Sequence, residues 1–401
     1  MRVQLASINT KTSVLICCAA ACAFGQNWVQ TIAPVSHWDS VASSADGSNL
    51  VAVAWQNQAG NFGGLFVSTN SGATWSDTSP SHNDWMSVAS SADGRKLVAV
   101  EGFYEGGPIY LSTNSGANWM QSSAPSNYWS AVCSSADGQK LIAASPSTYA
   151  DGLIYRSTDG GGSWAPTSAP SLPWVSLVSS ADGSKLMATA SMTACAGLGC
   201  GSWSAIYISR DGGASWVAGN VSGIPLSSSA CSADGTRLVA LGGSTILSTN
   251  SGGTWYTNVT VCGAGVAATP DGTRLLVASA GFINVSTDWG TTWTSLSLPT
   301  NVFPRALAVC ADGSRLLLAS SDSYLYQLIS TPRPRLNLHV VDANALLAWS
   351  VPSRSFVLQR SSDMGNWIDE NVAPSFSLSN IEFEVTVPAS SKLGFYRMKS
   401  N

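Results

Sequence analysis

The sequence predicts an all-β fold: a seven-bladed β-propeller closed by its N-terminal strand, followed by a small C-terminal β-sandwich. An Asp-Gly turn recurs at intervals of propeller-blade length, with its Asp at Asp46, Asp93, Asp137, Asp182, Asp234, Asp271 and Asp312. A second motif, Ser-x-(Asp or Asn)-x-Gly-x-x-Trp, begins at Ser68, Ser112, Ser157, Ser209, Ser248 and Ser286. The apolar runs between these motifs are short and β-branched, and none shows the 3.6-residue period of a helix.

Each repeat is predicted to form four short strands. In the second repeat the strand-like runs are WMSVASS, KLVAV, PIYLST and NWMQSS, and turn residues separate them. Asp-Gly between the first two runs is a strong hairpin signal, because Gly accepts a positive φ and Asp bonds the local backbone.

The seventh repeat has its Asp-Gly turn but no second motif and no fourth strand. The N-terminal segment NWVQTIAP, residues 27–34, resembles the fourth-strand segments NWMQSSAP and SWAPTSAP of the second and third repeats. We therefore expect residues 27–33 to form the outer strand of the seventh blade, which closes the ring and removes an exposed seam. The propeller then spans residues 27–330.

The second motif also has a local explanation. Its Asp or Asn caps backbone amides of a tight turn between the third and fourth strands, Gly takes the strained position, and Trp packs back over the turn. It matches the Asp-box, or BNR repeat. The chain thus resembles the Asp-box propellers: sialidases, xyloglucanases, sortilin-type receptors and photosystem II assembly-factor-like proteins. In those families the box is a fold element away from the active face.

A second region follows the propeller. Residues 331–335 form a linker that Pro332 and Pro334 stiffen. Residues 336–401 contain several alternating or apolar runs and are predicted to form the small β-sandwich. The segments VLQRSSDMGNW and FYRMK resemble fibronectin-III-like modules of secreted bacterial proteins.

The N-terminus predicts export. Arg2 and Lys11 are basic, SVLICCAAACAF is apolar, and ACA at 21–23 is a small-x-small cleavage site, so residues 1–23 are interpreted as a signal peptide. No second long apolar segment follows, so we expect a protein that does not span a membrane and is secreted, periplasmic or at the cell surface. Among the remaining cysteines, Cys195 and Cys200 are the predicted disulfide. The other four are either paired or buried free thiols.

Composition and motifs narrow the function. The charged fraction is 10% and the net charge −4, which gives no basic footprint for nucleic acid. The histidines show no zinc-ligand spacing, and the sequence has no nucleophile elbow, phosphate loop or dinucleotide fingerprint. We expect a monomer without a cofactor or metal.

The candidate ligand-binding residues are aromatic. The links between blades and the second-to-third-strand loops lie on the face opposite the Asp-Gly turns and boxes. Trp38, Trp85, Trp129 and Trp174 each stand eight residues before a turn Asp, and this fixed register favours packing between blades. Aromatic residues without fixed register in the loops of blades one to four are the binding candidates: Trp55, Phe103, Tyr104, Tyr149 and Trp203.

The alternative function is a glycoside hydrolase, which needs two carboxyl groups across a cleft. The candidate acids are Glu101, Glu105 and Asp151, against the simpler interpretation that these are solvated loop acids. A sialidase is not favoured, because only Arg305 lies clearly on the candidate face. The leading hypothesis is a secreted, non-catalytic propeller that binds a glycan or an extracellular protein through the loop-bearing face of blades one to four.

Overall fold

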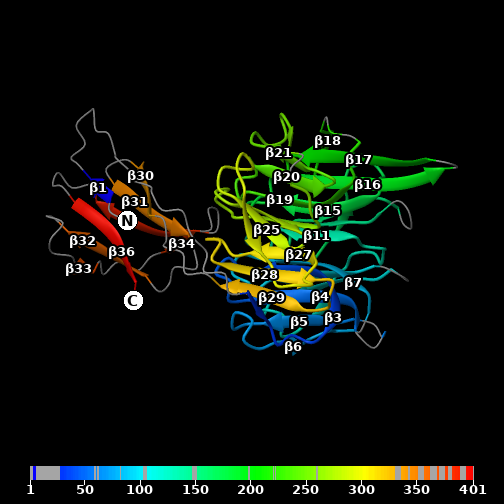
Figure 1. The fold of residues 1–401 in the computed structure, drawn as a ribbon, viewed down its shortest axis with the longest axis horizontal. Helices are drawn as coiled ribbons and strands as arrows, with labels where there is room; N and C mark the ends of the chain where they lie inside the picture. The colour runs from blue at the N-terminus through cyan, green and yellow to red at the C-terminus, as the bar shows by residue number, and fades with distance from the viewer. Residues whose placement is uncertain are drawn as a thin grey trace.

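The computed structural model of the chain describes residues 3–5, 28–57, 60, 63–81, 83–102, 106–146, 151–196, 199–219, 221, 223–258, 261–329, 336–341, 344–350, 356–361, 368–369, 375–377, 382–388 and 394–400. These residues form β-strands joined by turns and loops. Seven four-stranded antiparallel sheets make up the propeller predicted from the sequence, and they are arranged side by side in a ring (Figure 1). The all-β, seven-bladed prediction is therefore confirmed.

The strands follow the predicted order within each blade. Blade 1 contains β3 (Ser36–Ser43), β4 (Leu50–Asn57), β5 (Leu65–Ser68) and β6 (Ser76–Asp77), and blade 2 contains β7 (Trp85–Ser90), β8 (Leu97–Glu101), β9 (Ile109–Ser112) and β10 (Met120–Gln121). Blade 3 contains β11 (Ala131–Ser134), β12 (Leu141–Ala144), β13 (Ile154–Ser157) and β14 (Ala165–Pro166), and blade 4 contains β15 (Trp174–Ser179), β16 (Leu186–Ala196), β17 (Gly199–Ser209) and β18 (Val217–Ala218). Blade 5 contains β19 (Leu226–Cys231), β20 (Leu238–Gly242), β21 (Thr245–Ser248) and β22 (Tyr256–Asn258), and blade 6 contains β23 (Gly265–Ala268), β24 (Leu275–Ser279), β25 (Phe282–Ser286) and β26 (Thr294–Ser297). Blade 7 contains β27 (Pro304–Val309), β28 (Arg315–Ser320), β29 (Leu325–Ile329) and the N-terminal strand β2 (Trp28–Gln30).

The N-terminal strand closes the ring as predicted. Strand β2 pairs antiparallel with β29, with Trp28 opposite Leu328 and Gln30 opposite Tyr326. The backbone N–H of Thr31 extends this pairing by donating to the carbonyl of Leu325 at 2.9 Å. The seventh blade therefore contains both ends of the propeller, and no neighbouring blade is left without a partner.

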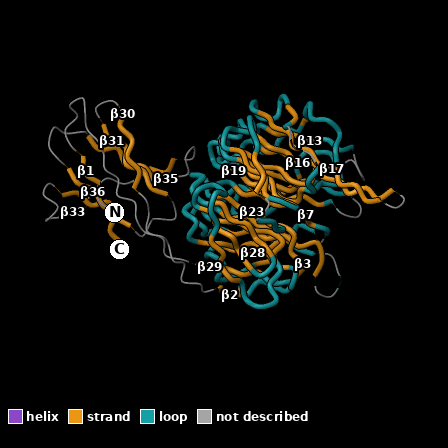
Figure 2. Tube along the Cα trace, turned by 45° about the horizontal axis from the view of Figure 1, so that its top comes forward, coloured by secondary structure: helices purple, strands orange, loops and turns teal. Residues whose placement is uncertain are grey.

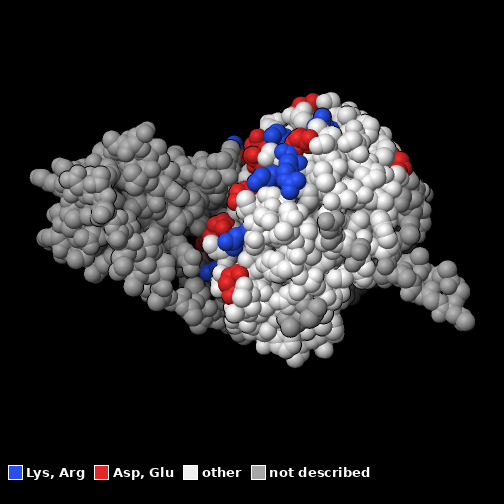
Figure 3. Space-filling view, turned by 90° about the horizontal axis from the view of Figure 1, so that it is seen from above, with Lys and Arg blue, Asp and Glu red and all other residues white. Residues whose placement is uncertain are grey.

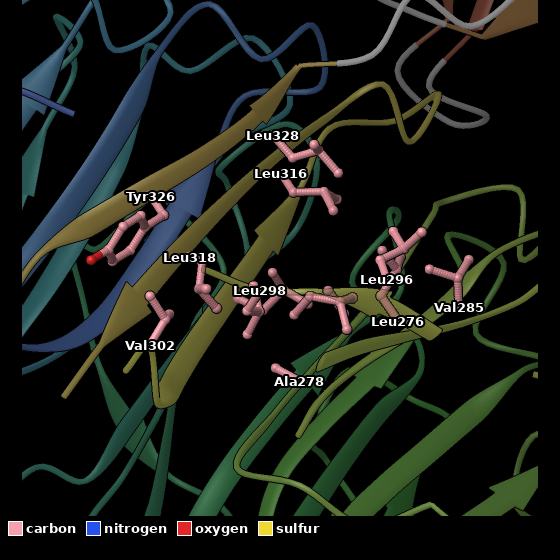
Figure 4. Packing of buried hydrophobic residues seen from close by; sticks show 13 residues of the cluster. Leu276, Ala278, Val285, Leu296, Leu298, Val302, Leu316, Leu318, Tyr326 and Leu328 are labelled. Atoms are coloured by element: carbon pink, nitrogen blue, oxygen red, sulfur yellow. The ribbon is translucent and has the colours of Figure 1, made fainter. Parts of the chain in front are cut away.

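The hydrophobic core is divided among the interfaces between blades. Each neighbouring pair of blades encloses one cluster of buried side chains, such as the cluster between blades 6 and 7 that includes Leu276, Leu298 and Leu318 (Figure 4). Alternate residues of a central strand serve different interfaces: Val51 and Val53 of β4 pack toward blade 2, whereas Ala52 packs toward blade 7. Both faces of each sheet are covered, which explains the near-continuous apolar runs of the central strands.

The Asp-Gly turns use one repeated hydrogen-bond pattern. In blade 3, Ser135 Oγ donates to Asp137 Oδ1 at 2.5 Å, and the N–H of Gln139 donates to the same oxygen at 2.9 Å. The N–H of Lys140 in turn donates to Ser135 Oγ at 2.9 Å. One buried Ser and one Asp therefore satisfy the polar groups of the turn, as the sequence suggested.

These turns are also linked to one another around the axis. The residue before each turn Asp donates its N–H to the carbonyl of the equivalent residue in the next blade, as Ala136 does to Ala181 at 2.8 Å and Ala181 does to Ala233 at 2.7 Å. Ala311 of blade 7 continues the circle to Ala45 of blade 1 at 2.8 Å. Pro270 has no N–H, so its link to blade 7 is missing and the circle has one gap.

The Asp-boxes form the predicted turns. In blade 3, Ser157 Oγ donates to Asp159 Oδ1 at 2.7 Å and accepts the N–H of Gly161 at 2.8 Å. The residue after the box Asp or Asn has a positive φ in several blades, including 59° at Ser71 and 55° at Trp289. The box thus supports a left-handed turn that a plain Ser or Trp would adopt only with strain.

The described C-terminal residues form two more four-stranded sheets together with residues 3–5. One has the order β30 (Leu336–Val341), β31 (Asn344–Ser350), β35 (Glu382–Pro388) and β34 (Ser375–Ser377). The other has the order β1 (Val3–Leu5), β36 (Gly394–Ser400), β32 (Phe356–Ser361) and β33 (Ile368–Asp369). The likeness to fibronectin III and the domain boundaries remain predictions. Strand β1 lies inside the predicted signal peptide, so cleavage there would remove it from its sheet.

Candidate binding face

The strand order gives the propeller two distinct ends. The Asp-Gly turns and the Asp-boxes lie at one end, called here the turn face, and the links between blades and the second-to-third-strand connections lie at the other, called the loop face (Figure 2). Lys and Arg residues occur at ten positions between residues 28 and 329, and nine of them belong to the turns and boxes or bond to them: Arg95, Lys96, Lys140, Arg156, Lys185, Arg210, Arg237, Arg274 and Arg315. Figure 3 shows the charged side chains gathered along one side of the propeller, with little charge elsewhere in that view.

Most of the Lys and Arg side chains of the turn face donate hydrogen bonds to backbone carbonyls of the neighbouring blade. Lys140 Nζ donates to the carbonyl of Asp182 in the next blade at 2.8 Å, and Arg237 Nη1 donates to the carbonyl of Gly272 at 2.7 Å. Each such contact ties one blade to the turn of its neighbour. An arginine triad for an acidic sugar is therefore not assembled on the described loop face, where Arg305 is the one Lys or Arg.

Arg305 forms an ion pair on the loop face across the closing seam. Its Nη2 lies 3.1 Å from Asp39 Oδ1, joining β27 of blade 7 to β3 of blade 1, and the two side chains are 46% and 14% exposed. Burial raises the pKa of Asp39 from 3.8 to about 6, while Arg305 opposes this increase and Asp84 adds to it. Both residues stand seven positions before a turn Asp, where the other five blades carry uncharged residues.

Glu101, a candidate catalytic acid, is enclosed rather than solvated. It ends strand β8 and is 2% exposed. Ser81 Oγ donates to its Oε1, and Asn83 Nδ2 donates to its Oε2 at 2.9 Å. Burial raises its pKa, against the effect of these two bonds and with a further increase from Asp84. A Cβ on Gly107 would lie 2.6 Å from Glu101 Oε2, so the carboxylate fills its niche.

Asp151, the second candidate acid, holds a loop of blade 3 together. Its Oδ1 accepts from Ser145 Oγ at 2.5 Å and from Asn127 Nδ2 at 3.2 Å, and its Oδ2 accepts from Tyr155 Oη at 2.7 Å. Burial would raise its pKa, but these bonds outweigh burial and lower it. Asn83 and Asn127 each stand two residues before an inter-blade Trp, so the two acids anchor equivalent links. The third candidate, Glu105, lies outside the described residues.

The four register-fixed tryptophans pack between blades, as the sequence favoured. Trp38, Trp85, Trp129 and Trp174 are fully or almost fully buried. The indole N–H of Trp129 donates to the carbonyl of Gly107 at 2.9 Å, and that of Trp174 donates to Gly152 at 2.8 Å. The Trp85 Nε1 has no hydrogen-bond partner among the described residues. These residues belong to the core and do not form a ligand surface.

Of the five aromatic residues predicted to bind a ligand, two lie among the described residues. Trp55 lies on β4, half-buried and stacked on His37 with ring centroids 5.5 Å apart. Trp203 lies on strand β17, not in a loop, and is 41% exposed. Phe103, Tyr104 and Tyr149 lie outside the described residues. The structure adds Phe282 and Phe303, which are 47% and 54% exposed on the loop face of blades 6 and 7.

Sequence reasoning missed the Asp39–Arg305 pair as a unit. The sequence does contain a signal for this pair, because a charged residue at a position that is uncharged in the other repeats marks a position with a separate role. The two charges occupy the same register position in blades that become neighbours only after the ring closes. Their partnership therefore depends on the seam, which a search within single repeats does not detect.

Two features are absent from the described residues. No group of three or more His, Cys, Asp or Glu side chains is placed there to hold a metal ion. That part of the chain also contains no helix of the length and apolar character needed to cross a membrane. Of the cysteines, Cys133 and Cys310 are buried free thiols, Cys231 is half-buried and Cys262 is exposed.

The fold is a seven-bladed β-propeller whose blades carry Asp-box turns between the third and fourth strands. It is structurally similar to "YCF48 bound to D1 peptide", with a TM-score of 0.57, 16% identity, and coverage of 82% of this chain and 100% of that one. It is also similar to YCF48 from Cyanidioschyzon merolae, with a TM-score of 0.55, 15% identity, and coverage of 75% and 98%. A hydrazine synthase of Kuenenia stuttgartiensis gives a TM-score of 0.57 at 15% identity, with coverage of 76% and 97%.

No protein-family model matches the sequence, and no curated protein matches it. The identities to the three solved structures are low, so the similarity concerns the fold.

Proposed function

We propose that this chain is a non-catalytic propeller that binds a segment of an extracellular protein through its loop face. The observation that carries the proposal is the separation of side chains between the two faces. Nine of the ten Lys and Arg residues between positions 28 and 329 belong to the turn face or bond to it, whereas the loop face carries the exposed side chains Trp203, Phe282 and Phe303 and the Asp39–Arg305 ion pair. Exposed aromatic side chains are typical anchors of protein interfaces.

The similar fold named above with a bound peptide supports a peptide ligand over a glycan. The hydrolase alternative has less support, because a catalytic acid must reach its substrate. The two described candidates, Glu101 and Asp151, use their oxygens to hold the links of blades 2 and 3. Export to the cell exterior remains part of the proposal and rests on residues 1–23.

The test uses a phage-displayed random-peptide library, panned against the immobilised protein, together with a glycan array. We expect enriched peptides whose affinity falls about tenfold or more in Trp203→Ala and in Phe303→Ala, since each removes an aromatic anchor. Met120→Ala is the control, because Met120 is also an exposed large apolar residue, at 65%, but lies on the outer strand β10.

Three outcomes would contradict the proposal. They are enrichment of glycans alone, hydrolysis of a bound glycan, or peptide binding that Met120→Ala weakens as much as the loop-face variants do.

A further inference from the structure

The first strands of the blades carry a β-bulge near their loop-face ends. Each first strand contacts the first strands of both neighbouring blades, so these strands line the axis of the ring. In five blades the pairing with the second strand shifts register at the position seven residues before the turn Asp. A bulge leaves its extra residue outside the ladder and changes the direction of the strand. The residues at the five shifts are Asp39, Met86, Val175, Ser227 and Arg305.

Two of the five bulged residues are charged, and closure of the ring brings these two together. Arg305 Nη2 lies 3.1 Å from Asp39 Oδ1, but the arginine side chain is 46% exposed and the aspartate only 14%. A molecule that approaches this ion pair from solvent therefore meets the cation first. Within the described residues the guanidinium makes no contact to a second acid, so most of its N–H donors remain available.

The charged groups of the neighbouring blades leave Asp39 poorly compensated. Burial raises the pKa of Asp39 to about 6, although Arg305 of blade 7 opposes this increase and Asp84 of blade 2 adds to it. Burial and Asp84 raise the pKa of Glu101 as well, against hydrogen bonds from its neighbours. Asp84 and Glu101 are 3% and 2% exposed. Three enclosed carboxyl groups thus lie near one cation.

The remaining elements around Asp39 bring no second cation to it. The part of β4 that faces its bulge, residues 52–57, has no titratable side chain. Strand β28 also contacts β3, but its charged residue Arg315 lies at the turn-face end and bonds to the carbonyl of Gly47. His37, on β3 itself, is stacked on Trp55. The charge state of Asp39 therefore depends on Arg305 more than on any other cation.

We propose that Arg305 binds a carboxylate group of the peptide ligand in competition with Asp39, so that binding is coupled to uptake of a proton by Asp39. The inference rests on the proposed function, because it names the chemical group that the peptide presents to the loop face. A planar guanidinium binds a carboxylate through two parallel hydrogen bonds. Once displaced from Arg305, the enclosed Asp39 keeps Asp84 beside it and has little access to solvent, so it takes a proton from water.

The coupling sets the direction and size of a pH effect. If the peptide binds the form of the protein in which Asp39 is protonated, the apparent affinity follows the population of that form. With a pKa of about 6, Asp39 is about 3% protonated at pH 7.5 and about 75% protonated at pH 5.5. We therefore expect the affinity to rise about 20-fold over this range, in which an ordinary ligand carboxyl group stays ionised.

The test starts from peptides enriched by the same phage panning at pH 5.5 and measures their binding to the full chain by isothermal titration calorimetry at pH 5.5 and 7.5. Each peptide is synthesised with an amidated C-terminus, with Asn and Gln in place of its Asp and Glu, and with both changes. A tenfold or larger loss in the first form identifies the terminal carboxylate as the group bound, and a similar loss in the second identifies an acidic side chain.

The protein variants separate the two roles in the ion pair. Arg305→Gln should weaken binding about tenfold or more at pH 5.5, whereas Arg95→Gln, the same change at an exposed position of the turn face, should not. Asp39→Asn should bind at pH 7.5 as tightly as the wild type binds at pH 5.5, a gain that a misfolded chain would not produce. His37→Asn should keep the wild-type pH dependence, because His37 does not contact Arg305.

Three results would overturn the inference and leave the proposed function intact. They are peptide binding that Arg305→Gln does not weaken, a pH dependence that persists in Asp39→Asn or disappears in His37→Asn, and full affinity of the peptides that lack every carboxylate. A panning that enriches no peptide at either pH would overturn the proposed function, and the inference with it.

Discussion

A propeller that closes through its N-terminal strand should lose much of its stability when that strand is removed. The perturbation is a chain that begins at Val35, after an initiating Met. It lacks the three residue pairs between β2 and β29 and the Thr31–Leu325 bond. It also lacks Trp28, which packs on the cluster between blades 6 and 7, and the buried Ala33 between blades 7 and 1.

The magnitude follows from these contacts. About three or four backbone hydrogen bonds contribute roughly 2–5 kcal/mol net, at about 0.5–1.5 kcal/mol each. Half-burial of Trp28 adds about 1–2 kcal/mol. The sum, roughly 3–7 kcal/mol, is a large part of the 5–15 kcal/mol that is typical of a folded domain. Since 1 kcal/mol shifts the melting temperature of a large domain by about 2–4 °C, we expect a fall of at least about 6 °C.

The assay is thermal unfolding by circular dichroism, followed by addition of a synthetic peptide of residues 26–34. The peptide should stabilise the truncated chain by about 1.4 kcal/mol at tenfold excess over its dissociation constant, and so raise the melting temperature in a concentration-dependent way, whereas a scrambled peptide should not. Within the intact chain, Trp28→Ala should be destabilising and Val29→Ala, on the exposed side of the strand, nearly neutral. A truncated chain that melts at the wild-type temperature would refute the closure.

Three more predictions follow from single contacts. Trp129→Phe should cost about 1 kcal/mol more than Trp85→Phe in urea unfolding, because only the Trp129 indole donates a hydrogen bond, to Gly107; equal losses would contradict this. Asp39→Asn should flatten the pH dependence of stability between about pH 4 and 6. The folded pKa of about 6 exceeds the unfolded value of 3.8, so the wild type loses stability as pH rises through this range, and an unchanged slope would count against a buried Asp39. Hydrogen bonds from Ser163, Ser215 and Thr292 hold the pKa of Asp159, Asp211 and Asp288 at about 2, so these groups lose their stabilising effect as pH falls from about 4 to 2. Replacing all three Asp residues by Asn, the residue already present at Asn70, Asn114 and Asn250, should reduce the loss of folding stability between about pH 4 and pH 2, as measured by pH-jump unfolding. If the variant and the wild type lose the same stability over this range, the three carboxylates contribute nothing.

The number of blades and the strand order within each blade could be predicted from the sequence, because both are marked by turns whose hydrogen bonds are local. Asp-Gly with a preceding Ser, and the Asp-box, each satisfy their own hydrogen bonds within a few residues, so their chemistry is visible in any single repeat. The seam was predictable for a similar reason, since residues 27–34 look like fourth strands found elsewhere in the chain. Fixed register also identified the inter-blade tryptophans as core residues.

The candidate face was less predictable because its features depend on contacts between distant segments. Glu101 was expected in a solvated loop, but it is enclosed by Ser81, Asn83 and Gly107, and no one of these residues signals burial by itself. The Asp39–Arg305 pair exists only because blade 7 meets blade 1. The length of β16 and β17 was not predicted, because the mostly small, uncharged residues 193–202 suit a loop as well as a strand.

The pairing of Trp28 with Leu328 has a consequence for how the chain could be rearranged. The first and last strands of the propeller lie in neighbouring positions of one sheet, so the two ends of the ring are about one strand spacing apart. A short linker could join residue 329 to residue 28, and new termini could be opened in the link between two other blades, such as 219–226. Each blade would keep both of its neighbours in such a circular permutant. The packing of the blades therefore does not determine which blade carries the chain termini.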